Sequence, residues 1–489
     1  MAQQVQSTGL GTSIQNQAAF STRLIMAKEI RFSEVISALS VALDITQGHP
    51  AGHCMRSALI GMRIAQELRL SSADRSALFY ALLLKDLGCS SNAAKMCYLF
   101  GADDRELKHN LRLTNFCNPL EAMKAAWKNC APGGSVFEKM KKMAGILSLG
   151  DKGSKEIAAI RCERGADISR KLQLPEATAR AILDLDEHWD GGGAPLGLKK
   201  SEISLLGRIC CLAQTVEVFF TSHGMDRALQ MALERRGKWF DPELVDLLFE
   251  FNREETFWDR LMGRKLIANL NDWEPDDAVM IADEACLDRV AEAFAMVVDA
   301  KSPWTYQHST RVAEITVGIA SQFPATPEVV RDLRRAAMLH DIGKLGVSNT
   351  ILDKPGKPTD EEFAQIRKHP EYTQRILNQV SAFQFMGDVA GAHHERLDGR
   401  GYHRGLAGDQ IAWGSRVLTV ADICEALTAK RPYREEMQWD QVRKILNKDI
   451  GTAVDGDCVR ALEAWYERNE LRSRIDQQFE EIDRLFASL

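Results

Sequence analysis

The sequence lacks the features that mark several other classes of protein. It has no run of 18 apolar residues and no charged-then-apolar leader, so we expect neither a membrane span nor a secretory signal and place the protein in the cytoplasm. Its eleven cysteines are scattered without a CxxC pattern, which indicates reduced thiols rather than disulfides or a thiolate zinc site. No glycine-rich loop opens a helix as in a P-loop, and no serine or cysteine nucleophile is indicated.

Composition and charge narrow the class further. The 489 residues are 45% hydrophobic and 27% charged, which is typical of a soluble globular protein with about two to three domains. The net charge of −6 gives no reason to expect binding to long nucleic acid, although a small anionic ligand remains open. Strand patterns are rare. We therefore predict an all-α fold of two helical domains in tandem, with little or no strand.

The second half of the chain concentrates imidazole and carboxylate groups. Six of the 11 histidines lie between positions 308 and 403. A single histidine is more often a hydrogen-bonded core residue, but a set of this size favours a metal site, and its donors suit divalent first-row metals such as iron or manganese. Metal-assisted hydrolysis becomes the leading hypothesis. The candidate ligands are His308, His340, Asp341, His369, His393, His394 and Asp422.

The two halves of the chain form an internal repeat. His308 precedes His340 by 32 residues, and His53 precedes Lys85 by the same 32. AAMLHDIGK at 336–344 overlays ALLLKDLGC at 81–89, and DGRGYHRGL at 398–406 overlays DGGGAPLGL at 190–198. The length difference, about 47 residues, falls between Asp86 and Arg161. Two copies with one localised insertion explain this pattern.

The overlay predicts which half is active. The seven candidate ligands fall, in order, on His53, Lys85, Asp86, Arg161, Leu185, Asp186 and Gln214. The cations Lys85 and Arg161 would repel a divalent ion. We expect the first half to be a metal-free pseudo-domain, kept for packing or regulation.

Local signals suggest the domain layout. Ser302 and Pro303 predict the start of the helix that carries His308, and Thr359 with Glu362 forms a capping box. From about residue 462 the chain resembles a charged amphipathic helix, which either caps the core or pairs with another chain; a homodimer and a protein partner of the N-terminal domain remain open. The expected layout is a flexible tail at 1–28, a degenerate domain at 29–255 with an insertion at about 90–155, a linker at 256–283, and a catalytic domain with C-terminal helices at 284–489.

Adjacent His340 and Asp341 suggest the chemistry. Neighbouring side chains on a helix project about 100° apart, so Asp341 is able to bridge two ions while His340 holds one of them. Two ions about 3.5 to 4 Å apart activate a shared water and stabilise a phosphoryl displacement. Lys344, about one turn further on, would place its ammonium on a phosphate oxygen.

Five motifs resemble those of the HD-GYP family of bacterial phosphodiesterases. They are HDIGK at 340–344, KPGKPTDEEF at 354–363, HP at 369–370, HHERLDGRGYHRGL at 393–406 and ADICEALTAKRPYR at 421–434, and the resemblance covers about 285–455. It implies cleavage of a cyclic dinucleotide, chiefly cyclic di-GMP, with two or three iron or manganese ions. By resemblance, the seven candidates are metal ligands with Asp341 bridging, Lys344 contacts phosphate and Arg431 lies on the substrate side.

Two departures from the family pattern refine this expectation. Members with a third ion carry a glutamate where this chain has Trp304, so we expect two ions. His403 replaces the proline of the family's GYP, which puts the loop conformation in doubt. The leading function is hydrolysis of cyclic di-GMP or 3'3'-cyclic GMP-AMP by a metal-bridging hydroxide. The alternatives are a signalling scaffold with weak or no catalysis, and an HD-type phosphohydrolase of another nucleotide.

Overall fold

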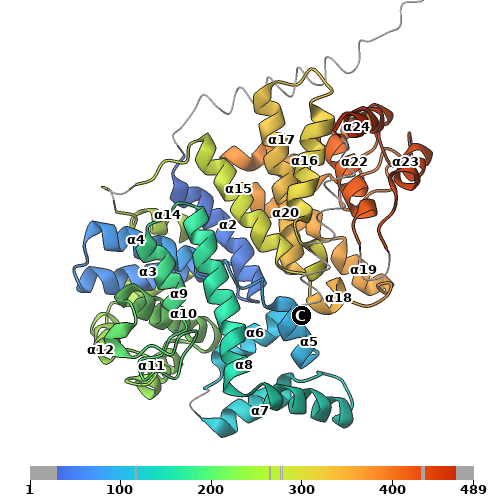
Figure 1. Cartoon of the computed structure of the whole chain (residues 1–489). Coiled ribbons are helices and arrows are strands. Elements are labelled where there is room, and N and C mark those ends of the chain that lie inside the picture. The colour runs from blue at the N-terminus through green and yellow to red at the C-terminus, as the bar shows by residue number, and fades with distance from the viewer. Residues whose placement is uncertain are drawn as a thin grey trace, which may run out of the picture. The chain divides into compact units, whose positions relative to one another are not determined.

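A computed structural model describes residues 30–469, apart from 116–117, 264–265, 276, 278 and 431–434. Within these residues the chain is built from helices, and the only β-type contacts are three isolated bridges (Figure 1). The prediction of an all-α fold is confirmed. The predicted tail at 1–28, Arg431 and the end of the C-terminal segment lie outside the described residues.

Contacts divide the chain into two compact units. Among the described residues, the first unit comprises 30–306 with Lys344–Lys354, and the second comprises Gln307–Gly343 and 355–469. The helix expected to open the catalytic domain, α15, is thus grouped with the first unit, and the boundaries suggested by the sequence stay a prediction. The α-helices of the first unit are α2 (Phe32–Thr46), α3 (His53–Glu67), α4 (Ser72–Leu84), α5 (Ala93–Phe100), α6 (Asp104–Leu113), α7 (Pro119–Asn129), α8 (Val136–Lys171), α9 (Glu176–Asp184), α10 (Leu205–His223), α11 (Met225–Arg235), α12 (Pro242–Phe251), α13 (Glu255–Met262), α14 (Leu266–Asn271), α15 (Glu284–Asp299) and α18 (Asn349–Leu352). Those of the second unit are α16 (His308–Ala320), α17 (Pro327–Leu339), α19 (Asp360–Ile366), α20 (His369–Leu377), α21 (Gln384–Gly391), α22 (Trp413–Thr428), α23 (Trp439–Lys448) and α24 (Gly456–Asn469).

The same helix packing occurs once in each unit. In the first unit α3 packs against α4 and α10, and α9 packs against both α4 and α10. In the second unit α16 packs against α17 and α22, and α21 packs against both α17 and α22. Helices α4 and α17 begin and end at positions that differ by 255, as the sequence overlay requires. The prediction of two tandem domains of one fold is confirmed.

Helix starts follow local capping chemistry, with one correction. The side chain of Thr326 accepts a hydrogen bond at the start of α17, and Thr359 with Glu362 forms the predicted capping box of α19. Ser302, in contrast, caps only the 3₁₀ helix η3 (Pro303–Thr305). Gln307 then takes a left-handed conformation with φ of 55°, so the helix that carries His308 begins at His308 itself. The prediction that Ser302 starts this helix was wrong, because the left-handed conformation of Gln307 separates η3 from α16.

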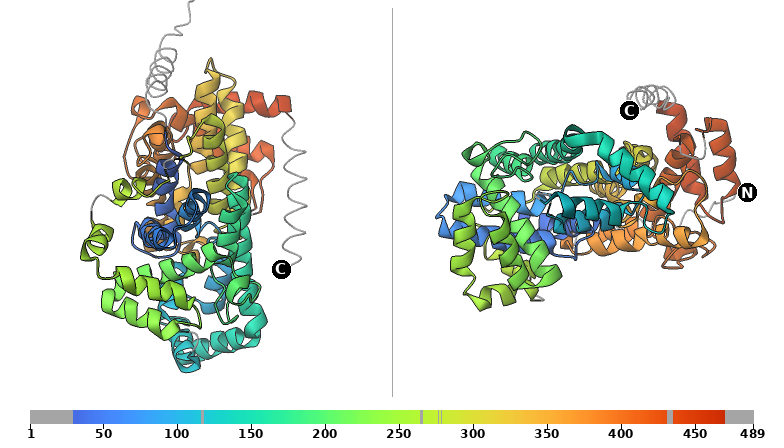
Figure 2. Two further views of the ribbon diagram at one scale, coloured as in Figure 1. Left: turned by 90° about the vertical axis from the view of Figure 1, so that its left-hand side faces the viewer. Right: turned by 90° about the horizontal axis from the view of Figure 1, so that it is seen from below.

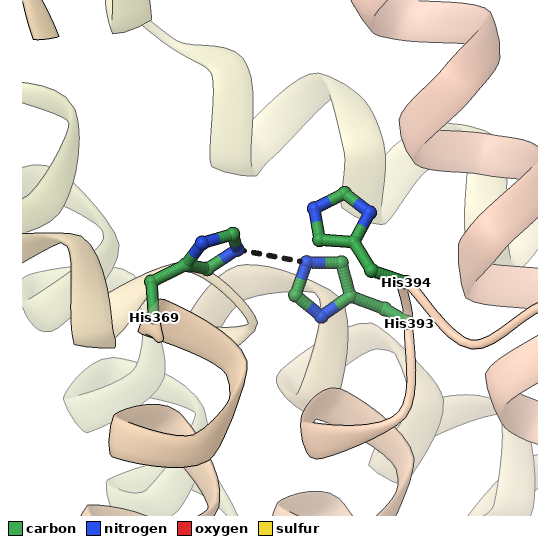
Figure 3. Close-up of side chains that lie close together, drawn as sticks. All are labelled: His369, His393 and His394. Atoms are coloured by element: carbon green, nitrogen blue, oxygen red, sulfur yellow. Dashed lines mark hydrogen bonds between the residues drawn. The ribbon is translucent and has the colours of Figure 1, made fainter. Parts of the chain in front are cut away.

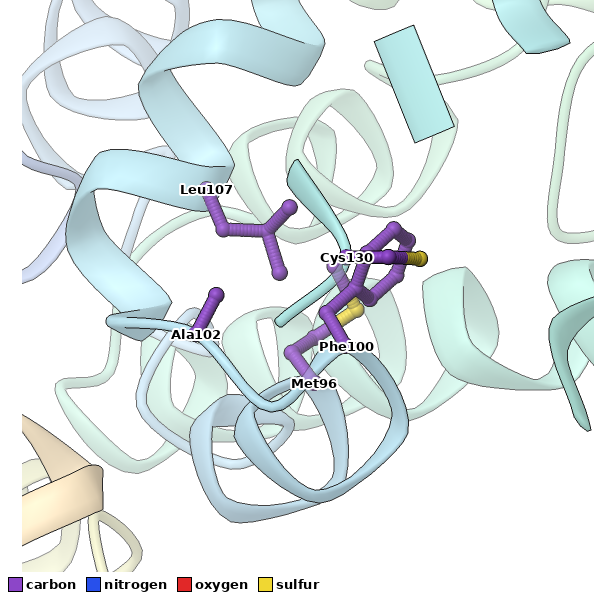
Figure 4. Packing of buried hydrophobic residues seen from close by; sticks show 5 residues of the cluster. All are labelled: Met96, Phe100, Ala102, Leu107 and Cys130. Carbon is purple, nitrogen blue, oxygen red and sulfur yellow. The ribbon is translucent and has the colours of Figure 1, made fainter. Parts of the chain in front are cut away.

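The insertion of the first unit has a small core of its own. Helices α5, α6 and α7 and the first part of α8 surround five buried side chains, Met96, Phe100, Ala102, Leu107 and Cys130 (Figure 4). Helix α8, teal to green in Figure 2, bends at Gly150, where φ is 60°. Its second part continues into the repeated fold. The insertion is therefore a folded addition rather than a long loop.

Helix α10 is long and apolar enough to cross a membrane by length and composition alone. However, 72% of its apolar stretch is buried inside the protein. It packs against α3 and α9, as a core helix does.

Candidate metal centre

The structure brings all seven predicted ligands together in the second unit. His308 opens α16, His340 caps the end of α17 and Asp341 follows it. His369 opens α20, the pair His393 and His394 follows α21, and Asp422 lies in α22. Six of these side chains are buried and His394 is half-buried. Within this set, three groups hold their ligand atoms within 4.8 Å of one another: His369, His393 and His394; His308, His340 and Asp422; and His340, Asp341 and His393.

The two carboxylate oxygens of Asp341 face different histidines. Oδ2 lies 3.3 Å from Nε2 of His308 and 3.4 Å from Nε2 of His340. Oδ1 lies 3.2 Å from Nε2 of His369 and 4.0 Å from Nε2 of His393. Asp341 is therefore shared by two separate histidine pairs.

A second carboxylate, that of Asp422, lies beside one of the two histidine pairs. Oδ1 of Asp422 lies 3.5 Å from Nε2 of His308 and 3.7 Å from Nε2 of His340. Next to the other pair lies His394, whose ring centre is 4.1 Å from that of His393. Each side of Asp341 thus has two imidazoles and one further donor residue.

Hydrogen bonds orient the four buried imidazoles alike. The Nδ1 atoms of His340 and His369 lie 2.6 and 2.7 Å from the carbonyl oxygens of Ala337 and Ile366, and Nδ1 of His393 contacts the corresponding carbonyl three residues before it. Nδ1 of His308 contacts the carboxylate of Glu425. Carbonyl and carboxylate oxygens only accept, so each Nδ1 must donate its proton. Each Nε2 then presents a lone pair to the centre, which is the state a metal ligand needs.

The donor set fits a bound cation. Nε2 of His369 and Nε2 of His393 point at each other across 3.3 Å, with His394 beside them (Figure 3). With both Nδ1 atoms protonated, two lone pairs face each other, an arrangement that a cation or a shared proton relieves. Neutral imidazoles with carboxylates suit divalent first-row metals. These residues are able to hold metal ions.

Burial and neighbouring groups shift the pKa values of two of the candidate ligands, His393 and Asp422. Burial, followed by the neighbouring imidazoles, lowers the pKa of His393 well below its usual range and keeps that ring neutral. Burial by itself would raise the pKa of Asp422, but the neighbouring imidazoles, that of His340 first, lower the pKa well below the usual range. A neutral ring and an ionised carboxylate are the forms that bind metal.

Glu425, which was not among the residues predicted from the sequence, contacts the ligand His308. Glu425 is buried, and its other oxygen lies 2.6 Å from the guanidinium of Arg311. The first unit repeats this arrangement, in which Glu217 contacts both His53 and Arg56. A signal was present, because the pairs Arg56/Arg311 and Glu217/Glu425 keep their identity at the offsets of the overlay.

Glu425→Gln is expected to weaken metal binding about 10- to 100-fold, because a carboxylate behind a ligating histidine fixes its tautomer and raises its basicity. The measurement is metal content by mass spectrometry after dialysis against graded chelator. Glu314→Gln, which removes an exposed acid from the same helix as His308, is the control and should bind like wild type. Equal retention of metal by both variants would contradict this role for Glu425.

A loop after His394 covers part of this centre. The buried carboxylate of Glu395 accepts hydrogen bonds from the backbone N–H groups of Arg404 and Leu406 at 3.0 and 3.1 Å. Gly401 passes so close that an added Cβ would lie 2.6 Å from Cα of Glu395. The ring of Tyr402 lies 4.6 Å from that of His394, and His403 is exposed. The proline lost at His403 is thus replaced at a surface position.

The corresponding centre of the first unit is filled by its own cations. Nζ of Lys85 lies 2.8 Å from Nε2 of His53 and forms an ion pair with Asp86. Arg161 forms an ion pair with Asp186 at 2.6 Å. Burial alone would lower the pKa of Lys85, but the carboxylate of Asp86 raises it above its usual range. A fixed ammonium therefore occupies the position that faces the histidine.

Three residues singled out in the sequence do not belong to the second unit as described. Two of them are in the first unit, and the third is not among the described residues. Lys344 belongs to the 3₁₀ helix η4 (Ile342–Gly346) and, by its contacts, to the first unit. Trp304 lies in η3, also in the first unit, and the two-ion expectation drawn from it stays a prediction. Arg431 falls in the undescribed residues 431–434.

Comparisons with known proteins show the family of this chain. The HD domain family matches residues 151–244 and 292–458. The chain is 42% identical to 3'3'-cGAMP-specific phosphodiesterase 3 of Vibrio cholerae over 88% of this chain and 93% of the relative. The chain belongs to the HD domain family, and within it to the HD-GYP phosphodiesterases of cyclic dinucleotides.

A solved structure and one more relative extend the comparison. A crystal structure of a cyclic GMP-AMP specific phosphodiesterase of V. cholerae matches with a TM-score of 0.62 and 38% identity, over 89% of this chain and 98% of that one. A cyclic di-GMP phosphodiesterase of Pseudomonas aeruginosa, PA4108, is 44% identical over 27% of this chain and 32% of its own length. The relatives thus include enzymes named for both dinucleotides.

Proposed function

We propose that this protein hydrolyses a cyclic dinucleotide, with 3'3'-cyclic GMP-AMP as the preferred substrate, at a centre of two iron or manganese ions. The observation that carries the proposal is Asp341, whose two oxygens each face a different pair of histidines. The substrate preference is supported by the relative of V. cholerae, which aligns over nearly its whole length.

The proposed ligands divide into two sets that share Asp341. One ion would be held by His308, His340 and Asp422, and the other by His369, His393 and His394. Bound divalent ions would activate a water molecule and neutralise charge on the phosphate during displacement.

Other groups of the chain would orient the substrate. Lys344, three residues after Asp341, would donate to a non-bridging phosphate oxygen, and Arg431 would contact the dinucleotide from the substrate side. The reaction adds one water across one phosphodiester P–O bond and yields a linear dinucleotide. Tyr402, beside His394, would shield one edge of the centre from bulk water.

The test is hydrolysis of 3'3'-cyclic GMP-AMP, cyclic di-GMP and cyclic di-AMP side by side, with manganese or ferrous iron and after metal removal. We expect 3'3'-cyclic GMP-AMP to give a kcat/KM at least about tenfold above cyclic di-GMP, since hydrogen-bond differences at a base allow such discrimination. Chromatography of the products identifies the linear dinucleotide. Preference for cyclic di-GMP would overturn the substrate assignment, and no hydrolysis of any of the three would overturn the function.

A further inference from the structure

The segment Lys344–Lys354 packs with the first unit although it begins only three residues after the candidate ligand Asp341. It starts in η4 and includes the short helix α18, which lies against α5 of the insertion. The residue proposed to contact phosphate, Lys344, is its first member. The first unit therefore holds the piece of chain that leaves the metal centre.

A buried carboxylate of the insertion anchors the middle of this segment. Asp104, at the start of α6, is fully buried and accepts from Nζ of Lys301 at 2.8 Å and from the backbone N–H of Asn349 at 3.1 Å. The side chain of Asn349 donates to the carbonyl of Lys301 at 2.7 Å and to Asp353 at 2.6 Å. Burial alone would raise the pKa of Asp104, but the ammonium groups of Lys301 and Lys108 lower it, so the anchor is a charged carboxylate.

A second contact reaches closer to Lys344. The guanidinium of Arg105 donates to the backbone carbonyl of Gly346, two residues after Lys344. Its orientation is fixed by an ion pair with Asp103 at 3.0 Å. The side chain of Arg105 is partly exposed, so its removal leaves no buried charge unpaired.

These contacts come from the part of the first unit that the second unit lacks. Residues 104 and 105 lie between Asp86 and Arg161, where the first half carries its extra residues. The insertion has its own core, to which Ala102 and Leu107 contribute on either side of residues 104 and 105 (Figure 4). A folded addition that holds one short segment is suited to a positioning role.

We propose that Asp104 and Arg105 are positioning residues, which fix the backbone of residues 344–349 and thereby the ammonium of Lys344 for the transition state of phosphodiester hydrolysis. This inference rests on the proposed function. Displacement of a substrate-binding group by about 1 Å is enough to lower a rate up to about 100-fold.

The test compares Arg105→Ala with Arg105→Lys in the full-length protein. We expect Arg105→Ala to lower kcat about tenfold with KM little changed, because Lys344 acts in the transition state. Arg105→Lys, whose ammonium is able to reach the same carbonyl, should recover most of the loss. Metal content should stay at the wild-type level and Tm within about 2 °C of it. Arg170→Ala, which removes an arginine of an exposed ion pair with Glu176, is the matched control.

Hydrogen exchange gives a readout that does not depend on activity. In Arg105→Ala the amides of residues 344–354 should exchange faster, while those of 369–394 stay unchanged. Unchanged exchange in 344–354 would overturn the inference, as would faster exchange with an unchanged kcat. If the wild type hydrolyses no cyclic dinucleotide, the proposed function fails, while the exchange experiment still decides whether Arg105 holds the segment.

Discussion

Asp341→Asn is expected to lower kcat for cyclic dinucleotide hydrolysis by at least about a thousandfold, which corresponds to roughly 4 kcal/mol of transition-state stabilisation. Among the described residues, Asp341 is the carboxylate whose two oxygens face both histidine pairs. An amide has a single oxygen and no negative charge, so it is unable to serve both sides. The measurements are initial rates at saturating metal and metal content of the purified variant.

Asp388→Asn is the matched control for this substitution. Asp388 lies on α21, is exposed and bonds only to the side chain of Gln374 among the described contacts. The substitution Asp388→Asn removes the same charge from the same unit and should leave the rate of hydrolysis unchanged. The circular dichroism of both variants should equal that of wild type. A rate for Asp341→Asn within about tenfold of wild type would show that catalysis does not depend on a shared carboxylate.

Lys85→Met is expected to destabilise the protein by about 3 to 5 kcal/mol, because it leaves the buried carboxylate of Asp86 without its ion-pair partner. Gln47 and Cys54 contact the same carboxylate, but neither carries positive charge. The measurement is urea unfolding of the metal-free protein, followed by the transition that reports on the first unit.

A second substitution separates the charge effect from a packing effect. In the double variant Lys85→Met/Asp86→Asn no buried charge is stranded, so much of the lost stability should return. Lys95→Met removes an exposed lysine of the same unit and should change stability by less than about 0.5 kcal/mol. Equal stability of Lys85→Met and Lys95→Met would contradict the ion pair as a source of stability.

Much of the fold could be predicted from the sequence because the two halves of the chain repeat each other and can be compared position by position. The interval that separates His53 from His308 also separates both ends of α4 from those of α17. Residue types at equivalent positions then separated the half that gathers histidines from the half that carries Lys85 and Arg161. Helix-capping preferences predicted the start of a helix correctly where the capping side chain bonds to its own helix, as at Thr359.

The remaining features depend on contacts between distant parts of the chain. Nothing local in the sequence indicates that Asp104 accepts a hydrogen bond from Asn349, 245 residues later. Gln307 takes its left-handed conformation without being glycine, so the interruption before His308 carried no residue signal. Glu425 differs from these, because its ion pair with Arg311 repeats that of Glu217 with Arg56 and therefore left a signal in the repeat.

The ammonium of Lys85 has a consequence for the protein when divalent metal is scarce. A cation that belongs to the chain is present from synthesis onward, so the first unit needs nothing from its surroundings to complete its core. Removal of metal should then change the second unit and leave the fold of the first unit as it is.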